Sequence, residues 1–376
     1  MLERHSSQAT WMPPITTDFL STDTTSKLQR SLLRWFGGHC RDLPWRRDRD
    51  PYRIWVSEIM LQQTQVATVI RYFERFLESF PTIGDLAEAD EQEVFRVWEG
   101  LGYYRRAHHL HQAARRIVQN HGGVFPRDPE AVAALPGIGR YSKGAILSQA
   151  FGDRLPILEA NSQRVLCRLF AQRGDPRKGP TRRWLWRTAE ALLPRRQAGE
   201  FNQALMELGA LICTPTSPRC LACPLRRLCR AARLGLEEII PIPAKKENLL
   251  HVREVSVVIR QHRRVLLLQR PRNGRWAGLW EFLHGQVGDD ETYEEAARRQ
   301  AHNLAGMKIV LESELATLRH SVTHHRITLK CFAARHRGGS FRSAFYLARA
   351  WVTPEEISGY AVSSPQRRLA KMLLSP

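Results

Sequence analysis

Apolar side chains recur at helical spacing over the first two thirds of the chain, and this pattern predicts a helical domain over residues 27–232. The clearest stretch begins at Asp50-Pro51, where an N-cap precedes a proline at the first helical position, and one helix is expected to run from there to Pro81. Its apolar positions, spaced as on one helix face, are Ile59, Val66, Ile70, Phe73 and Leu77.

The pattern changes after a proline-containing and charged segment, residues 233–250, which is expected to be a linker. The segments VREVSVVIR and RRVLLLQRP then predict two strands joined by a polar turn, and ITLKCFAA predicts a further strand. Residues 291–306 predict a helix, so residues 251–376 form an α+β domain. Residues 1–26 are rich in Ser and Thr and are expected to be a flexible tail.

The charge of the chain points to a polyanionic partner. Its 376 residues suffice for two domains, and 57 Lys and Arg against 37 Asp and Glu leave a net charge of +20. A single basic run is usually a solvated helix face, but an excess over the whole chain favours the phosphates of nucleic acid. One stretch carries eight of the cations: Arg173, Arg177, Lys178, Arg182, Arg183, Arg187, Arg195 and Arg196.

Neither a membrane span nor a signal peptide is evident, because no apolar stretch reaches 18 residues and the first 25 residues lack a continuous hydrophobic segment. We therefore expect an intracellular protein, in the cytoplasm or nucleoid if bacterial, that does not contact membranes. Four of seven cysteines lie close together, which in a reducing compartment favours a metal site over disulfides. Their donor set suits zinc or an iron-sulfur cluster: Cys213, Cys220, Cys223 and Cys229.

Two further features carry candidate chemistry. Residues 135–139 form a turn between helical runs, in which Gly137 and Gly139 can expose backbone N–H groups to an anion. Lys143 follows and is expected to contact phosphate or solvent. Glu58 lies among apolar neighbours, where desolvation favours a protonated carboxyl, as a general acid requires, although an exposed position is the usual fate of a glutamate.

These motifs together resemble the MutY family of DNA glycosylases, which is related to endonuclease III. The resemblance rests on the cysteine spacing, on the glycine turn followed by Glu159, and on the segment SEIMLQQTQVATVI that contains Glu58. It implies a mainly α helix-hairpin-helix domain with an iron-sulfur loop at residues 213–229. The loop would hold one 4Fe-4S cluster with no catalytic part, and no catalytic metal is expected. A zinc knuckle is the alternative.

The resemblance also assigns roles to the polar residues. It implies that Glu58 protonates adenine and then assists the incoming water, while a second carboxylate stabilises the oxocarbenium-like sugar. The family's Asp-Gly-Asn appears here as Glu159-Ala160-Asn161, so the acid is one methylene longer and the glycine's freedom is lost. We expect the local backbone to compensate and Glu159 to serve. Tyr141 stands where the related lyases carry a Schiff-base lysine, so the reaction should end at an abasic site.

By the same resemblance, Gln63 and Tyr103 enter the duplex beside the flipped base. Without it, either residue could equally belong to an ordinary helix end or a packed aromatic pair. The residues implied to surround the extruded adenine are Arg41, Leu43, Trp45, Arg46, Leu61 and Glu207.

The second domain resembles a disarmed Nudix domain. Gly285, Glu291 and Arg299 match the start of a Nudix box, but Gln300, Asn303 and Leu304 replace the carboxylates that would bind Mg²⁺, so a Nudix hydrolase is not expected. MutY proteins use such a domain to recognise 8-oxoguanine, and residues 274–282 and 318–326 match its best-defined segments.

In the second of these segments, Val322-Thr323-His324 replaces the family's Phe-Ser-His, with Thr323 and His324 expected to contact the lesion. The histidines here could suggest a metal site, but base or phosphate contact from a loop between strands is preferred.

The sequence therefore predicts a monomeric, monofunctional glycosylase that removes adenine opposite 8-oxoguanine or guanine in duplex DNA. It does not identify protein partners. One alternative is a lesion-binding protein disarmed by the change at residues 159–160, against which the retained Glu58, Tyr141 and Asn161 argue. The other is an endonuclease III-like lyase, against which Tyr141 and the appended domain argue.

Overall fold

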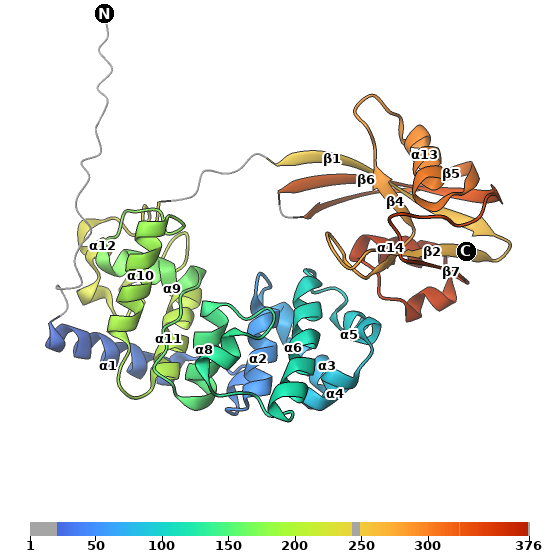
Figure 1. Ribbon diagram of the computed structural model, residues 1–376. Coiled ribbons are helices and arrows are strands. Elements are labelled where there is room, and N and C mark those ends of the chain that lie inside the picture. Colours follow the sequence, from blue (N-terminus) through green and yellow to red (C-terminus); the bar gives the residue numbers. More distant parts are fainter. Residues whose placement is uncertain (1–20, 243–248, 323, 375–376) are drawn as a thin grey trace, which may run out of the picture. The chain divides into compact units, whose positions relative to one another are not determined.

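The computed structural model describes residues 21–242, 249–322 and 324–374 (Figure 1). The chain divides into two compact units, each discontinuous in sequence. The first comprises Met1–Ile54 and Ile138–Ala244, and the second comprises Trp55–Gly137 and Lys245–Pro376. Thr323 and the tail over residues 1–20 lie outside the described residues. The predicted domains are continuous in sequence, at residues 27–232 and 251–376, and therefore differ from these two units. The predicted boundaries stay a prediction.

The first unit is helical. Its elements are α1 (Thr22–His39), η2 (Pro44–Arg46), α8 (Arg140–Phe151), α9 (Ala160–Phe170), α10 (Gly179–Leu192), α11 (Ala198–Leu211), η3 (Cys220–Ala222), η4 (Arg226–Leu228) and α12 (Arg230–Leu234). Helix α1 begins within the predicted tail because the Ser21 hydroxyl accepts a hydrogen bond from the Thr24 amide and caps it.

Helix α11 lies at the centre of this unit and packs against α1, α8 and α9. Phe201, Leu205 and Leu208 fill the core from its buried face. Two glycines set how closely it approaches its neighbours: a Cβ on Gly199 would lie 2.3 Å from the Ser148 carbonyl oxygen, and one on Gly209 would lie 2.6 Å from the Asn161 Cβ. Glycine at these positions therefore allows α11 to pack closely against the later turns of α8 and against the start of α9.

Helices also make up the first segment of the second unit. They are α2 (Pro51–Leu61), whose first four residues belong to the first unit, α3 (Val66–Ser79), α4 (Ile83–Glu88), α5 (Glu91–Trp98), α6 (Arg105–His121) and α7 (Pro129–Ala133). The prediction of one helix from Pro51 to Pro81 is wrong, because residues 62–65 separate α2 from α3 and Gln63 has a left-handed φ of 57°. A polar run that breaks an apolar helix is where this turn occurs.

The second segment of this unit forms a seven-stranded sheet with helices. Its elements are β1 (Leu250–Gln261), β2 (Arg264–Gln269), β3 (Trp280–Glu281), β4 (Leu283–Gln286), α13 (Tyr293–Ala305), β5 (Lys308–Val322), β6 (His325–Gly338), β7 (Ala348–Val352), η5 (Glu355–Gly359) and α14 (Ser364–Met372). The strand order is β3-β2-β1-β6-β5, with β4 paired to β1 and β7 to β2. Strands β1 and β6 are parallel, and the other pairs are antiparallel.

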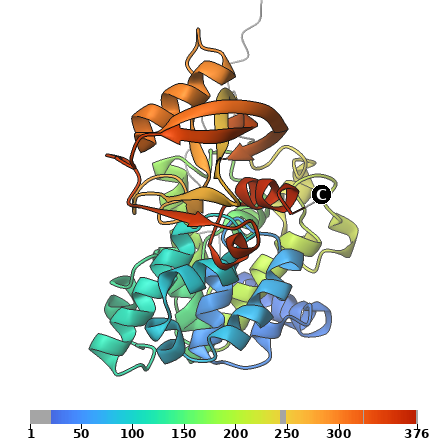
Figure 2. The same ribbon diagram turned by 90° about the vertical axis from the view of Figure 1, so that its right-hand side faces the viewer.

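Each face of this sheet buries its own apolar cluster, as the alternation of side chains along a strand requires. On β2, Leu266 and Leu268 face the cluster that contains Ala297 of α13, whereas Leu267 faces the one that contains Leu369 of α14. Figure 2 shows a helix on either side of the sheet. The predicted multidomain fold, helical first and α+β second, is confirmed.

Candidate functional site

The glycine turn joins α7 to α8 as predicted. Gly137 has a φ of 79°, and a Cβ there would lie 2.8 Å from the Cβ of His109, so glycine is required. Gly139 is the N-cap of α8 and brings no side-chain hydrogen bond to the first turn. The N–H groups of that turn point outward at the positive end of the helix dipole, which favours a phosphate there. Lys143 lies half-buried in the second turn.

Glu159 is the N-cap of the next helix, α9. Its Oε2 accepts a 2.7 Å hydrogen bond from the Asn161 amide, and its Oε1 accepts one of 2.7 Å from the Ser162 amide. The Ser162 hydroxyl accepts one from the Glu159 amide at 2.9 Å, which completes a capping box. Burial raises the pKa of Glu159 above its ordinary value, although the two amide hydrogen bonds act in the opposite direction.

The backbone after Glu159 needs no glycine. Ala160 is the first residue of α9 and has a helical conformation, in which alanine is favoured over glycine by about 1 kcal/mol. The expected loss of a required left-handed conformation therefore does not arise in this chain. Next to it, the Asn161 Oδ1 accepts a 2.7 Å hydrogen bond from Arg164, whose guanidinium also binds the Gly209 and Cys213 carbonyls.

A buried ion-pair cluster joins Glu207 of α11 to the segment before α2. Arg41 donates to both carboxylate oxygens at 2.8 Å, and Arg46 donates to Oε2 at 2.9 Å. Burial alone would raise the pKa of Glu207, but the hydrogen bonds from Arg41 and Arg46 outweigh it and hold the pKa at about 2. Leu43 and Trp45, in the same segment, are buried. The first unit thus brings together five of the six residues predicted to surround adenine.

Tyr141, in the first turn of α8, contacts α11 at Met206. The Tyr141 hydroxyl lies 3.4 Å from the Met206 Sδ, one residue before Glu207. Position 141 therefore carries a phenol, which cannot form a Schiff base.

In the second unit, Glu58 is one of the most buried charged residues. Its side chain is 3% exposed on α2, among Trp55, Val56 and Met60, which are all fully buried. Leu61, the sixth predicted adenine contact, is half-buried at the end of the same helix. Glu58 is therefore buried on a helix whose neighbouring residues are apolar.

Gln63 and Tyr103 share an unusual backbone conformation. Both have left-handed φ values, 57° and 48°, and both side chains are exposed, Tyr103 by 47%. Non-glycine residues rarely adopt this region, and such strain is concentrated at functional sites. Each lies at the tip of a short turn, so the two residues predicted to enter the duplex project from the surface.

Arg106 holds these two turns, a role that sequence analysis missed because Arg106 is one of several arginines on α6. Its buried guanidinium donates to the Ile59 and Met60 carbonyls at 2.9 and 2.8 Å, and to that of Gln62. It also donates to the Leu101 and Gly102 carbonyls, both at 3.2 Å. Burial lowers the pKa of Arg106 to about 10, so the group stays charged at neutral pH. One cation thus fixes both turns.

The cysteine loop surrounds a second buried arginine. Arg168 donates to the Cys213 Sγ at 3.3 Å and to the Thr214 and Pro215 carbonyls, and Cys229 donates to its backbone carbonyl at 3.4 Å. Burial, and after it the proximity of the other three loop cysteines, raises the pKa of Cys223 to about 12. Within the described residues, no three His, Cys, Asp or Glu side chains are arranged to hold a single metal ion.

The residues of the Nudix-like helix are used for packing. Arg299 pairs with Glu291 at 2.6 Å, and Gln300 donates to the Gln286 carbonyl at 2.8 Å while its amide packs against Gly285. No carboxylate stands at positions 300, 303 or 304.

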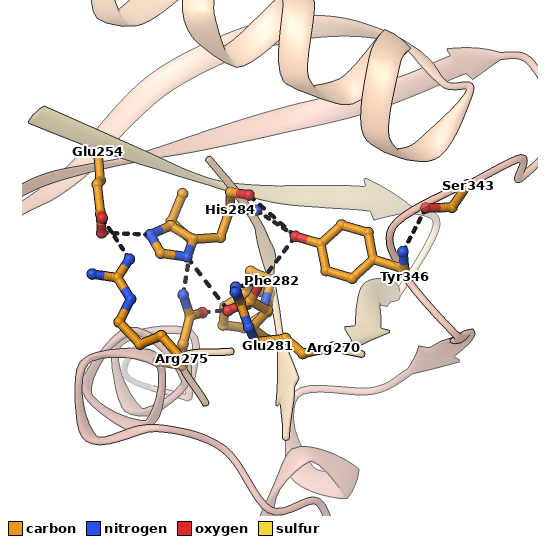
Figure 3. A network of polar contacts seen from close by, with 10 residues as sticks. Glu254, Arg270, Arg275, Glu281, Phe282, His284, Ser343 and Tyr346 are labelled. Carbon is orange, nitrogen blue, oxygen red and sulfur yellow. Dashed lines mark hydrogen bonds and ion pairs between the residues drawn. The ribbon is translucent and has the colours of Figure 1, made fainter. Parts of the chain in front are cut away.

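A charge network of three buried groups and two partly buried arginines lies beside that helix (Figure 3). His284 donates to Glu254 at 2.9 Å and lies 3.4 Å from Glu281, and Arg275 and Arg270 pair with these two carboxylates. Burial alone would lower the pKa of His284, but Glu281 and Glu254 raise it to about 9. The imidazolium is therefore charged at neutral pH and compensates two carboxylates that would be costly to bury unpaired.

This network predicts that stability falls in mildly alkaline solution. Because the pKa of His284 is raised by folding, its contribution is complete below about pH 6.5 and is lost as pH rises through about 9. Thermal melts of the parent should shift to lower Tm between pH 7 and 9.5, whereas His284→Gln should start lower and change less over that range. Equal pH dependence of both proteins would contradict the assignment.

The network supports the wall of a large cavity in the second unit. The Trp276 backbone has a left-handed φ of 58°. The centroid of its ring lies 5.7 Å from that of the His284 ring and 6.1 Å from that of the His320 ring. The cavity has a volume of about 910 Å³ and is lined by Tyr103, Trp276, His320 and Val322, among others. His320 and Val322 lie on β5 rather than on a loop, and the exposed His324 lies in the turn that follows.

Comparison with known proteins agrees with this architecture. Residues 56–191 match the model of the HhH-GPD superfamily of base excision DNA repair proteins, and residues 255–372 match that of the NUDIX domain. A solved structure of a thermostable thymine-DNA glycosylase is 30% identical, with a TM-score of 0.53, and covers 57% of this chain and 98% of its own. Fold and site thus define a DNA glycosylase of base excision repair, an enzyme that acts on DNA.

Curated relatives indicate which family of DNA glycosylases the chain belongs to. The adenine DNA glycosylase of Rattus norvegicus is 34% identical over 92% of this chain and 77% of its own length. That of Homo sapiens is 34% identical over 91% of this chain and 73% of its own. The chain belongs to the adenine DNA glycosylase family. No helix in the described part of the chain is long and apolar enough to cross a membrane.

Proposed function

We propose that this protein hydrolyses the N-glycosidic bond of adenine paired with 8-oxoguanine or guanine in duplex DNA, as a monomer, and leaves an abasic site. The observation that carries the proposal is the carboxyl of Glu58, 3% exposed on an apolar helix, in a chain that also caps α9 with a carboxylate at position 159. A buried acid and a hydrogen-bonded carboxylate are the two groups that glycosidic hydrolysis requires.

The proposed reaction begins with proton transfer from Glu58 to a ring nitrogen of the extruded adenine. The C1′–N9 bond then breaks, its electron pair leaves with the base, and the Glu159 carboxylate stabilises the positive sugar. Glu58, now ionised, accepts a proton from the water that adds to C1′. Tyr141 cannot form a Schiff base, so no strand cleavage follows.

The flipped adenine would lie against Arg41, Leu43, Trp45, Arg46, Leu61 and Glu207. With a pKa of about 2, Glu207 is ionised and can accept hydrogen bonds from the adenine amino group. Asn161, held by Arg164 and packed on Gly209, would keep the start of α9 in place.

Gln63 and Tyr103 would fill the space beside the extruded base, and the two turns fixed by Arg106 would hold them ready. Gly137, Gly139 and Lys143 would bind the phosphate backbone. Thr323 and His324 would recognise the opposite base, which would enter the cavity lined by Trp276 and Val322. The aromatic side chains of this cavity offer stacking, and the cations of the cavity favour an electron-rich base.

The first test is a single-turnover reaction on duplexes that contain one 8-oxoguanine:adenine, guanine:adenine or 8-oxoguanine:cytosine pair. Strand breaks are expected with the first two duplexes, only after alkali, and none with the third. Breaks without alkali would identify a lyase. Tight binding without an abasic product would identify a lesion-binding protein.

The four loop cysteines are proposed to hold one 4Fe-4S cluster. They fit it because their thiols are half-buried, because they lie close enough together to raise the pKa of Cys220, Cys223 and Cys229, and because Arg168 offsets the charge that thiolates would carry. The cluster would supply structure to the basic loop and no catalytic step. The side chains that would bind it are Cys213, Cys220, Cys223 and Cys229.

Metal analysis distinguishes this cluster from zinc. We expect about four irons per chain with visible absorbance, both reduced strongly in Cys223→Ser. Cys40→Ser, an exposed cysteine outside the loop, is the matched control and should retain both. One zinc per chain and no iron in the parent would refute the cluster.

A further inference from the structure

Helix α10 of the first unit (Figure 1) and the residues on either side of it carry a basic surface that no step of the proposed reaction uses. Residues 173–196 hold eight cations and two carboxylates, a net charge of +6. All eight cationic side chains are exposed. This basic α10 surface consists of Arg173, Arg177, Lys178, Arg182, Arg183, Arg187, Arg195 and Arg196.

The protein itself neutralises little of this charge. Asp175 pairs with Arg177 at 2.8 Å, and the other seven cations make no ion pair with the described residues. The positive charge is also uncompensated at the start of α10, because the first turn of this helix contains no acidic residue and Lys178 is the N-cap. Cations at the positive end of a helix dipole are destabilising unless an anion offsets them. The surface is therefore complementary to a polyanion outside the chain.

The basic α10 surface adjoins the phosphate-binding turn. Arg140, the first residue of α8 after the turn, stacks its guanidinium on the Trp186 ring of α10 at 4.0 Å. Trp186 is buried, with Arg182 and Arg183 about one turn before it and Arg187 directly after. Within the first unit, Arg140 thus lies between the N–H groups at the start of α8 and the cations of α10.

We propose that the duplex flanking the target pair runs from the hairpin over α10, with its phosphates on the basic α10 surface. A helix of 14 residues is about 21 Å long, a length over which duplex DNA carries about 12 charges. The helix is therefore long enough to lie along several phosphates of a duplex, and the surface has the opposite charge. The inference rests on the proposed function, since it takes DNA as the partner, and it assigns a contact outside the base-reading elements.

The test measures how binding depends on salt. The variant Arg182→Gln/Arg183→Gln/Arg187→Gln is compared with the parent, both as full-length protein loaded with its metal, by fluorescence anisotropy on undamaged duplexes of 12 and 40 base pairs. Three lost phosphate contacts should reduce the slope of log K against log salt by about 2.7 for the long duplex. Its affinity at 0.1 M salt should fall about 10- to 100-fold, with a smaller loss for the short one.

The matched control neutralises three exposed arginines at and beside the turn between β1 and β2, Arg260, Arg263 and Arg264. It removes the same net charge, and its slope should stay within about one unit of the parent's. An unchanged slope in the α10 variant, an equal loss in the control, or equal losses on both duplexes would overturn the proposal.

Excision separates this inference from the proposed function. At saturating enzyme, the α10 variant should excise adenine at the parent's single-turnover rate, because none of its changes touches the base or the carboxylates. If the parent excises no adenine while the α10 slope still falls, the proposed function fails and the DNA-binding surface stands.

Discussion

Replacing Glu58 with glutamine is expected to lower the single-turnover rate of adenine excision by about 10²- to 10⁴-fold. The amide keeps the size of the side chain, which is 3% exposed, but cannot donate a proton to adenine or accept one from water. Lesion binding should be retained, because the variant changes the transition state and not the duplex contacts. Rapid-quench kinetics with alkali treatment measure the rate, and anisotropy measures the affinity.

The matched control is Glu74→Gln, the same change at an exposed position on α3. It should excise adenine at the parent's rate. A thermal melt within a few degrees of the parent shows that Glu58→Gln folds. If this folded variant kept a rate within about threefold of the parent, less than general acid catalysis supplies, Glu58 would not be the acid.

Replacing Glu159 with glutamine is expected to lower excision by about 10²- to 10³-fold, the effect of removing one charge-stabilising group from a transition state. Glu159→Asp keeps the charge and shortens the side chain, so we expect it to retain far more activity than the amide. The carboxylate is held by two amides at 2.7 Å, and aspartate is also a strong N-cap. Single-turnover rates of both variants test this order.

Thermal stability distinguishes a catalytic role of Glu159 from a purely structural one. Loss of an N-cap costs about 1 kcal/mol, so a drop in activity caused by fraying of α9 should be accompanied by a lower Tm. We expect Glu159→Gln to lose activity much further than its Tm predicts. If both variants excise as fast as the parent, Glu159 has no catalytic part.

The sequence predicted the secondary structure well where one face of an element is buried. The strands of VREVSVVIR, RRVLLLQRP and ITLKCFAA lie in β1, β2 and β6, and the helix over residues 291–306 is α13. It failed at residues 62–65, where a polar run forms a turn although apolar positions at helical spacing continue on both sides of it. That turn depends on Arg106, which donates to backbone carbonyls more than 40 residues away, and no local pattern reports such a contact.

The sequence by itself determined what short spacing encodes: the four cysteines, the glycine turn, the carboxylates at positions 58 and 159, and the periodicity that separates the helical part from the sheet. Only the tertiary structure decided which charges are buried and how they are neutralised. Glu207 meets Arg41 across 166 residues, and Glu254 meets His284 across 30. Burial and neutralisation depend on neighbours distant in sequence, and hydrophobic periodicity records only which face of an element is covered.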